Sequence, residues 1–451
     1  MAKLALLGGE PAVPEDQRHM DWPVVTKDDE EAVLRVLRSG KFVSTAEGEP
    51  EVRGLEEEWA RFIGAKYCLA VSNGTAALAL ALAALGIGPG DEVIVPSFSF
   101  VASALAPLHQ MAIPVFVDID PVSFNLDATK IEEKISPRTR AILVTHLHGL
   151  VADMDEINAV ARKHGLFVVE DAAQAHGATY KGKQAGTLGH MAGFSLHPQK
   201  NLPACGEGGL ITTDDEELCR RTGMMRQFGE VLKAGEDRLY LSRSLGWNHK
   251  LSPILAAFTR SQLTRFLDYQ AIRDANVPRF LGSLSGLPGL RVPAVPPDRT
   301  HAWHILRFRF DPTVAGLEGV GAGPFRQALR RALRAEGVPM SYYQVIPLPG
   351  QRVFTSHEGF GKGYPWTVES GQQYPYRIED YPCTLAVIED SLVLQRRQLS
   401  PTTGPLLDLY AGAFQKVWEN LDVIGRMARS VPYQPPWRSR QALEATGASA
   451  S

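Results

Sequence analysis

The sequence predicts an α/β protein with a large domain, built on a mixed, mostly parallel sheet between helices, and a smaller C-terminal α+β domain. From about residue 67 to residue 196, short β-rich apolar runs alternate with helical segments, as in βαβ units. Runs such as EVIVP and LFVVE are continuous rather than alternating in polarity, which suits strands buried on both faces. The length of 451 residues favours two domains, and the alternation weakens after about Asp268.

The large domain is predicted over residues 26–268, after an extended arm, residues 1–25, that is broken by three prolines. It opens with two helices, DDEEAVLRVLRSGK and RGLEEEWARFIGAK; the first has acids in its first turn and a glycine near its end. The elements that follow are YCLAVS, the apolar helix AALALALAALGI, DEVIVPS, a helix from about Ala102, IPVFVDID, TRAILVTHL, a helix over 154–164, LFVVED and AGFSL. Ligands of such sheets bind outside the carboxyl ends of the strands, so the residues after each strand are the candidates.

The small domain is predicted over residues 269–430, with helical patterns near 325–336 and 406–420. Between these helices, residues 349–382 form a long loop rich in Gly, Tyr, Pro and Trp, and long loops in compact domains are often functional or disordered. The tail, residues 431–451, is expected to be disordered.

The composition is that of a soluble globular protein, with 44% hydrophobic and 22% charged residues. A net charge of −3 gives no support to a nucleic-acid or membrane-surface partner. The longest apolar run is shorter than the roughly 20 residues of a membrane span, and no signal peptide opens the chain. The four cysteines form neither CxxC pairs nor a disulfide framework, so we expect a cytoplasmic protein.

The ends of the first two strands suggest a phosphate site and an aromatic lid. SNGT, residues 72–75, leads directly into the apolar helix: Gly74 lets a ligand approach the backbone, Thr75 offers a hydroxyl, and the helix N-terminus favours an anion. The alternative is that these polar residues only cap the helix. Phe100, after the next strand, could stack on a planar ligand or belong to the core.

Two later strands are followed by an acid and a lysine. Asp171 ends LFVVED, where a carboxylate needs a cation or several donors, so we expect a charged partner in the protein or in a ligand. Lys200, in FSLHPQKNLPACGEGG, is followed by glycines that allow tight backbone; an enclosed lysine can have a lowered pKa, and its neutral amine forms Schiff bases. Taken alone, Asp171 could belong to a structural ion pair, and Lys200 could be an ordinary surface charge. With the phosphate site and the aromatic ring they are the parts needed to hold pyridoxal phosphate.

The chain closely resembles the DegT/StrS family of pyridoxal-phosphate-dependent sugar aminotransferases. The likeness is dense over residues 41–263 and looser beyond them. It is carried by SGKFVSTAEGEPEVRGLEEEWARFIGAKYCLAVSNGTAALALALAALGIGPGDEVIVPSFSFVAS, VFVDID, VVEDAAQAHGATYKGK, GTLGH and FSLHPQKNLPACGEGGLITTDD. The resemblance implies a fold-type-I enzyme, usually a homodimer with active sites at the subunit interface.

The resemblance also implies roles for single residues. Asn248, in GWNHKLSPILAAFTRSQL, is expected to reach the cofactor phosphate from the partner subunit; without the family context it would be a helix cap. The other implied roles are Lys200 as the Schiff-base lysine, Asp171 as the partner of the pyridine nitrogen, Gln174 on the ring hydroxyl side, Phe100 as the stacking aromatic, and Gly74, Thr75 and Ser195 as phosphate contacts.

The expected reaction moves an amino group from L-glutamate or L-glutamine to a keto sugar, often nucleotide-linked, or to a keto cyclitol, in two half-reactions. LALLGGEPAVP, at the start of the chain, resembles family members that act on cyclitols. In residues 349–382, Trp366 and Tyr374 are candidates for stacking on the acceptor.

The sequence offers less support for other functions. A family variant that dehydrates sugars has histidine in place of the lysine; here the lysine is present, and His197 lies elsewhere in HPQK. A cofactor-binding regulator or partner subunit remains an alternative. A phosphate-loop nucleotide site needs GxxxxGK[ST], which does not occur, and the spacings of His146, His148, His176 and His190 match no metal motif.

Overall fold

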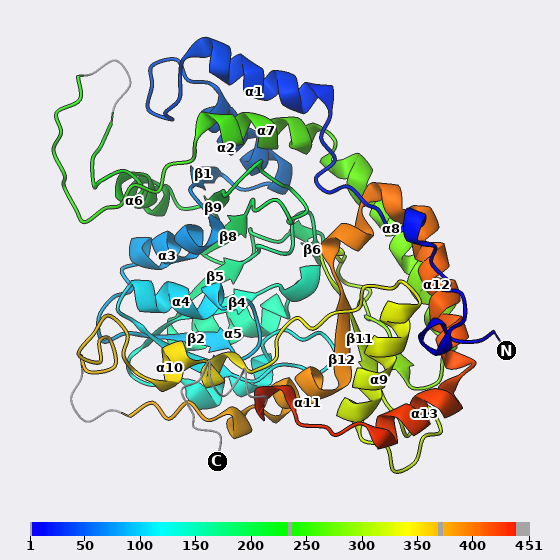
Figure 1. The fold of residues 1–451 in the computed structure, drawn as a ribbon. Coiled ribbons are helices and arrows are strands. Elements are labelled where there is room, and N and C mark those ends of the chain that lie inside the picture. Colours follow the sequence, from blue (N-terminus) through cyan, green and yellow to red (C-terminus); the bar gives the residue numbers. More distant parts are fainter. Residues whose placement is uncertain (1, 233–236, 369–372, 439–451) are drawn as a thin grey trace.

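The computed structural model describes residues 2–232, 237–368 and 373–438. Its main sheet has seven strands in the order β1-β9-β8-β5-β4-β2-β3 (Figure 1). Neighbouring strands from β8 to β3 are parallel, whereas β9 pairs antiparallel with both β8 and β1, so the predicted mixed, mostly parallel sheet is confirmed. The strands are β1 Tyr67–Val71, β2 Glu92–Pro96, β3 Ile113–Val117, β4 Thr139–Thr145, β5 Phe167–Asp171, β8 Met191–Ser195 and β9 Gly209–Thr213.

Strand β9 is the one main-sheet strand in the described residues that the sequence pattern did not single out. It is only five residues long and directly follows the glycine-rich segment after Lys200. It pairs back onto β8 with Ser195 opposite Gly209. The segment from 196 to 208 is therefore a long connection that leaves and re-enters the sheet beside the same strand, and Lys200 lies within it.

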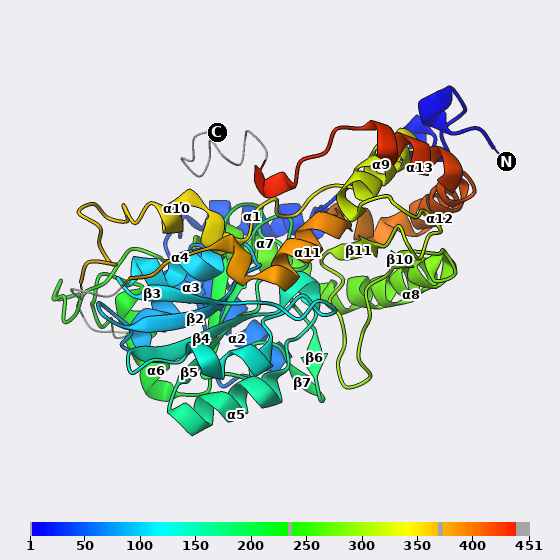
Figure 2. The same cartoon turned by 90° about the horizontal axis from the view of Figure 1, so that it is seen from below.

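Helices cover both faces of the sheet, and each face has its own core. One core contains Val93, Val169 and the side chains of α3; the other contains Ile94, Val168 and side chains of α2 and α5. Adjacent residues of a strand thus face opposite layers, as the period of two requires. Figure 2 shows α3 and α4 on one side of the sheet and α5 on the other. The helices of this part are α1 Lys27–Ser39, α2 Glu51–Ile63, α3 Gly74–Ala84, α4 Ala102–His109, α5 Met154–His164, α6 Glu216–Met225 and α7 Pro253–Thr264.

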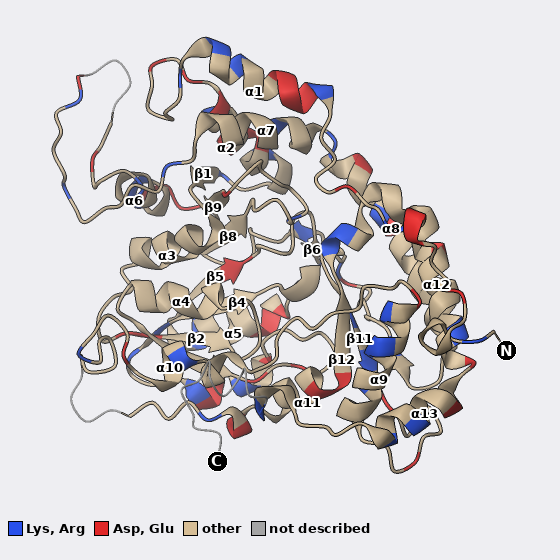
Figure 3. Ribbon diagram, in the orientation of Figure 1, with Lys and Arg blue, Asp and Glu red and all other residues tan. Residues whose placement is uncertain are grey.

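Helix α3 is buried on nearly every side, which explains its composition. It holds only Gly, Thr, Ala and Leu, and neither α3 nor α4 carries a charged Lys, Arg, Asp or Glu (Figure 3). The side-chain oxygen of Asn73 caps it by accepting a hydrogen bond from the N–H of Ala76 at 2.8 Å. The helix N-terminus is thereby fixed beside the ends of β1 and β8.

The C-terminal part is built on a second sheet, the antiparallel order β10-β11-β12, with helices packed on it. Leu4 and Val13, from the predicted arm, are buried in the core of this part. Helix α8 runs through the predicted boundary at residue 268 and continues past Pro278, held by Val277 and Phe280 in the same core. Its elements are α8 Phe266–Leu284, β10 Leu290–Arg291, β11 Leu306–Phe310, α9 Ala322–Ala335, α11 Pro382–Asp390, β12 Ser391–Leu394, α12 Gly404–Trp418 and α13 Leu421–Ser430.

Smaller elements complete the fold: a hairpin of β6 Thr179–Tyr180 and β7 Lys183–Gln184, and α10 Arg352–Thr355. Of the predicted disordered tail, residues 431–438 are described, with a short turn at Pro436–Arg438, and residues 439–451 lie outside the described residues. In the part of the chain that the structure describes, no helix is long and apolar enough to span a membrane.

Two aromatic residues of the long loop, Trp366 and Tyr374, do not lie where we predicted. Tyr374 donates to Glu92 at 2.8 Å, and Trp366 Nε1 donates to Tyr376, which in turn donates to the carbonyl of Pro114. Glu92 and Pro114 lie at the N-terminal ends of β2 and β3, the opposite end of the sheet from Lys200. The hypothesis that Trp366 and Tyr374 stack on the acceptor in this chain's cavity is therefore wrong: both side chains pin the loop to the sheet.

Candidate active site

A cavity of about 1070 Å³ opens at the carboxyl ends of β1, β2, β5 and β8. Seven of the eight predicted site residues line it: Gly74, Thr75, Phe100, Asp171, Gln174, Ser195 and Lys200. Phe100 is 56% exposed, so its assignment to the core is wrong and its ring is available to a ligand. These residues are far apart in sequence, and the sheet brings them to one edge.

Asn248 does not line the cavity, although its neighbours Trp247 and His249 do. Its backbone bridges to Gln227, and its side-chain oxygen accepts a hydrogen bond from Lys250 at 2.6 Å. Because side chains alternate along extended backbone, Asn248 points away from the cavity that its neighbours face.

The N-terminus of α3 forms a close-fitting cradle with the end of β8. A Cβ at Gly74 would lie 2.8 Å from the Cβ of Ser195, and one at Gly209 would lie 2.5 Å from the carbonyl oxygen of Asn73. Both contacts are too short for any side chain. The free N–H groups of the first helical turn, Thr75 and the hydroxyl of Ser195 therefore surround a space suited to a phosphate.

We predict that Gly74→Ala raises the dissociation constant for pyridoxal phosphate by about 10- to 100-fold, because the new methyl group overpacks the cradle by about 1–3 kcal/mol. Fluorescence titration of the apoprotein measures this constant. Gly412→Ala, in α12, is the control, since a Cβ there meets nothing within 4 Å. If Gly74→Ala and the control bound pyridoxal phosphate with equal affinity, the role of the cradle in phosphate binding would be contradicted.

The side chain of Asp171, the last residue of β5, points toward the layer of α3 and α4. Its carboxylate accepts a hydrogen bond from the hydroxyl of Ser103 at 2.6 Å and from the N–H of Ala173 at 3.2 Å. Among the described residues no cationic side chain lies within 4.0 Å of it, so the charged partner that we expected is not one of them. Ser103 belongs to a hydroxyl cluster with Ser99 and Thr145, and no motif in the sequence marks this cluster.

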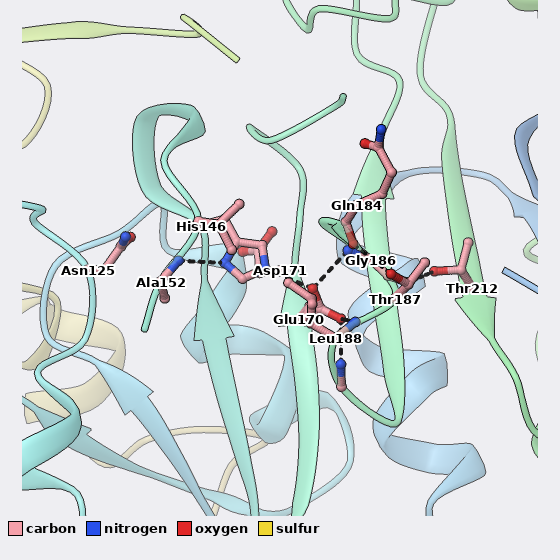
Figure 4. Close-up of polar contacts among 12 residues, drawn as sticks. Asn125, His146, Ala152, Glu170, Asp171, Gln184, Gly186, Thr187, Leu188 and Thr212 are labelled. Atoms are coloured by element: carbon pink, nitrogen blue, oxygen red, sulfur yellow. Dashed lines mark hydrogen bonds and ion pairs between the residues drawn. The ribbon is translucent and has the colours of Figure 1, made fainter. Parts of the chain in front are cut away.

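Glu170, the residue before Asp171, points to the opposite layer and is bound differently. Its carboxylate accepts hydrogen bonds from the backbone N–H groups of Gly186, Leu188 and Gly189 at 2.7–2.8 Å (Figure 4). His146 Nε2 completes the set at 2.8 Å, and His146 Nδ1 accepts from the N–H of Ala152, so the ring proton is on Nε2. Glu170 is therefore a fully satisfied structural acid, whereas Asp171 keeps capacity for a ligand.

Lys200 lies in the connection between β8 and β9, and its N–H donates to the carbonyl of His197 at 2.8 Å. Burial lowers the pKa of its amine from 10.5 to about 8, although the charges of Asp171 and Glu207 act in the opposite direction. Desolvation disfavours the ammonium form, so a useful fraction of the neutral nucleophile exists near neutral pH.

We predict that Lys200 of the apoprotein reacts with formaldehyde and borohydride with a pH midpoint near 8. Below this pH the ammonium form protects the nitrogen; above it the amine is free. Mass spectrometry of the labelled peptides measures the extent of modification, with exposed Lys183 in the same digest as the internal reference. A midpoint above pH 10 would show that the enclosure does not act on Lys200.

Gln174 is held in a fixed orientation by two partners that the sequence reasoning did not name. Its Oε1 accepts from the N–H of His148 at 2.8 Å, and its Nε2 donates to the hydroxyl of Tyr343 at 3.1 Å. Tyr343 comes from the C-terminal part and lines the cavity; burial raises its pKa to about 12, so it stays a neutral phenol. Nothing in the sequence around YYQ marks this tyrosine, because its place depends on how the two parts pack.

The rest of the cavity wall combines apolar side chains with polar side chains, almost all of them uncharged. Apart from Asp171 and Lys200, Glu207 is the one Asp, Glu, Lys or Arg among the described lining residues. The remaining wall is shared by both parts of the chain and includes His109, Gln110, Trp247, His249, Gln344 and Gln395. This surface can offer hydrogen bonds to a polyhydroxylated substrate.

The residues present fit pyridoxal phosphate. The cradle has no room for a Cβ at Gly74, Asp171 has a carboxylate without a cation, and Lys200 opens onto the same cavity. When bound, this cofactor supplies an electron sink for negative charge that develops on a substrate carbon.

A family model described as the DegT/DnrJ/EryC1/StrS aminotransferase family matches residues 23–370, most of the chain. The chain belongs to this family. The aminotransferase is pyridoxal-phosphate-dependent, as the strand ends and the sequence resemblance predicted.

Similar proteins of known activity or structure cover most of this aminotransferase. The dTDP-3-amino-3,6-dideoxy-alpha-D-galactopyranose transaminase of Aneurinibacillus thermoaerophilus is 42% identical over 74% of this chain and 92% of its own. The dTDP-3-amino-3,4,6-trideoxy-alpha-D-glucose transaminase of Streptomyces venezuelae is 37% identical over 75% and 83%. The structure of S. venezuelae DesV in complex with a ketimine intermediate is 32% identical, with a TM-score of 0.72 over 90% of this chain and 95% of that one.

Proposed function

We propose that this aminotransferase moves an amino group from L-glutamate or L-glutamine to the keto group of a sugar, often nucleotide-linked, or of a cyclitol, in two half-reactions at one cavity. We place this reaction in the cytoplasm, in the biosynthesis of an amino sugar or aminocyclitol; the free state of all four cysteines supports a reducing compartment. The observation that carries the proposal is that Lys200, with its lowered pKa, and Asp171 face one cavity whose remaining wall carries many uncharged hydrogen-bonding side chains.

In this proposal each residue of the cavity has a separate task. Lys200 holds the cofactor covalently between turnovers and, once released, moves a proton to and from the substrate carbon. Asp171, fixed by Ser103, keeps a proton on the ring nitrogen of the cofactor. Gln174 would contact the ring hydroxyl of the bound cofactor, and Phe100 would stack on the face of its ring. Gly74, Thr75 and Ser195 bind the phosphate.

The test is the absorbance of the cofactor-loaded enzyme before and after addition of L-glutamate and, separately, L-glutamine. We expect the visible band to disappear with one of the two donors and to return when a keto sugar or keto cyclitol is added. A candidate acceptor is supported when it restores the band and leaves as an amine of the expected mass. A band that neither donor changes would favour the non-transaminating alternative, a regulator or partner subunit.

We also propose that the active site is shared between two copies of the chain. Leu239, Tyr240 and Leu245 are 68–77% exposed apolar residues on the segment before Asn248, and Asn248 faces away from its own cavity. Large apolar side chains on a projecting segment favour a protein partner. The segment lies at the edge of the molecule, next to α6 (Figure 1).

Mixing two inactive variants tests the shared site. Lys200→Ala and Asn248→Ala are each expected to be defective, but a mixed dimer contains one site that has both a lysine and a partner asparagine. Activity should therefore return after the two variants are unfolded and refolded together. Each variant refolded alone is the control. The proposal would be contradicted if a mixture shown to contain mixed dimers did not regain transaminase activity.

A further inference from the structure

Two buried arginines lie behind the Lys200 connection, outside the cavity. Arg273 is in α8, and Arg396 follows β12; they are 1% and 2% exposed. Gln395 and His304, which adjoin this region, line the cavity, but neither arginine does. The pair therefore belongs to the back wall of the active site.

Most of the donors of these two guanidinium groups have no acceptor. Arg396 Nε donates to Asn201 at 2.8 Å and Arg273 Nη2 donates to Gln270 at 2.7 Å. Among the described residues, Nη1 and Nη2 of Arg396 and Nε and Nη1 of Arg273 are buried without a partner, as is the indole N–H of Trp22. Trp22 lies under Arg396, with 3.7 Å from the guanidinium carbon to the ring centroid. A buried cation without an acceptor is costly, so this group of donors requires an electron-rich partner.

The two arginines and Asp274 together leave an excess of one positive charge. Arginine stays ionised in proteins, so Arg273 and Arg396 contribute two positive charges. Asp274 contributes one negative charge, but its Oδ1 already accepts hydrogen bonds from Gln270 and Trp303. His176 and His304, the nearby histidines, are neutral because burial lowers the pKa of His176 to about 3 and that of His304 well below its usual value.

The two arginines are close enough to repel each other. Burial, and then the charge of Arg273, lower the pKa of Arg396. Stacking on Trp22 offsets part of this cost, because an aromatic face attracts a cation, but it leaves the guanidinium N–H groups unpaired.

We propose that Arg273 and Arg396, with the indole N–H of Trp22, bind one small inorganic monovalent anion, chloride being the natural choice. One such anion would neutralise the excess charge and accept hydrogen bonds from several of the unpaired donors. The near-complete burial of both side chains favours a small ion over a bulky carboxylate. The site would join α8, the end of β12 and, through Asn201, the connection that carries Lys200.

Diffraction from crystals soaked in bromide tests the site directly. We expect an anomalous peak within hydrogen-bond distance of Arg396 Nη1 or Nη2 and of Arg273. Ordered water at this place, without a halide peak, would overturn the proposal.

Thermal unfolding of the holoenzyme separates a small halide from larger anions. Replacing gluconate by chloride at constant ionic strength is expected to raise the unfolding midpoint by about 3 °C, because an anion that binds only the folded state stabilises it. Equal midpoints in gluconate, acetate and chloride would overturn the assignment to a small inorganic anion.

A pair of variants tests whether the chloride-dependent rise of the unfolding midpoint depends on the two buried arginines. Arg396→Met keeps an aliphatic chain on Trp22 and should abolish the chloride-dependent rise. Arg279→Met, which removes an exposed arginine from the same helix, should keep it in full. A full rise in Arg396→Met would overturn the proposal; if that variant does not fold, the bromide peak in the unaltered protein decides.

Discussion

Lys200→Ala is expected to lower kcat for transamination by about 10⁴-fold or more, because the variant loses both the nucleophile that holds the cofactor and the base that moves the proton. Pyridoxal phosphate should still bind through the cradle of Gly74, Thr75 and Ser195, but borohydride should no longer fix it to the protein. Stopped-flow absorbance after addition of the amino donor measures the rate, and mass spectrometry after reduction measures attachment.

Two further lysine variants separate chemistry from charge. Lys200→Arg keeps a positive charge but has no amine that can be deprotonated near neutral pH, so its loss should match that of Lys200→Ala. Lys183→Ala, on the surface hairpin, should behave like the unaltered enzyme. Substantial activity in Lys200→Arg would contradict the role of Lys200 as the proton carrier.

Asp171→Asn is expected to lower kcat by about 10²- to 10³-fold, which is typical when a preorganised electrostatic contact in an active site is lost. The amide is nearly the same size and its oxygen can still accept a hydrogen bond from Ser103, so the main changes are the loss of the negative charge and of the long hydrogen bond from the N–H of Ala173. Single-turnover absorbance with a saturating donor measures the effect. Ser103→Ala leaves the charge but frees the carboxylate, and we expect a smaller loss of about 10-fold.

Glu170→Gln is the matched control for Asp171→Asn, one residue earlier on the same strand. Its amide nitrogen would face backbone N–H donors at 2.7–2.8 Å, so the free energy of unfolding should fall by about 3 kcal/mol. Activity at a temperature where the variant stays folded should change little. If Asp171→Asn lost stability and kept activity, and Glu170→Gln did the reverse, the assignment of the two acids would be wrong.

The sequence predicted much of the cavity because parallel strands place their carboxyl ends at one edge of a sheet. Once the strands ending near Val71, Pro96, Asp171 and Ser195 were recognised, the residues that follow had to lie near one another. The two acids show the limit of this reasoning. A run ending in Glu-Asp does not say which carboxylate faces which layer; that depends on how β5 is inserted between the two cores.

Contacts between parts of the chain that are far apart in sequence could not be predicted from the sequence. Tyr343 reaches Gln174 across 169 residues, and Ser103 reaches Asp171 from a helix whose other polar residue is His109, at the opposite end. The hypothesis for Trp366 and Tyr374 failed for the same reason: their aromatic character was recognised, but their partners at the far end of the sheet were not.

The binding of Glu170 has a consequence for the order in which the chain folds. Its three backbone donors come from the turn at residues 186–189, which follows β5 in the chain. A folding chain that inserted β5 into the sheet before this turn closed would hold a buried carboxylate with His146 as the one remaining partner of its four, a state of high free energy. We therefore expect strand insertion and turn closure to be coupled. Asp171 is carried on the same strand, so we expect closure of this turn also to fix the proposed catalytic acid at the edge of the cavity.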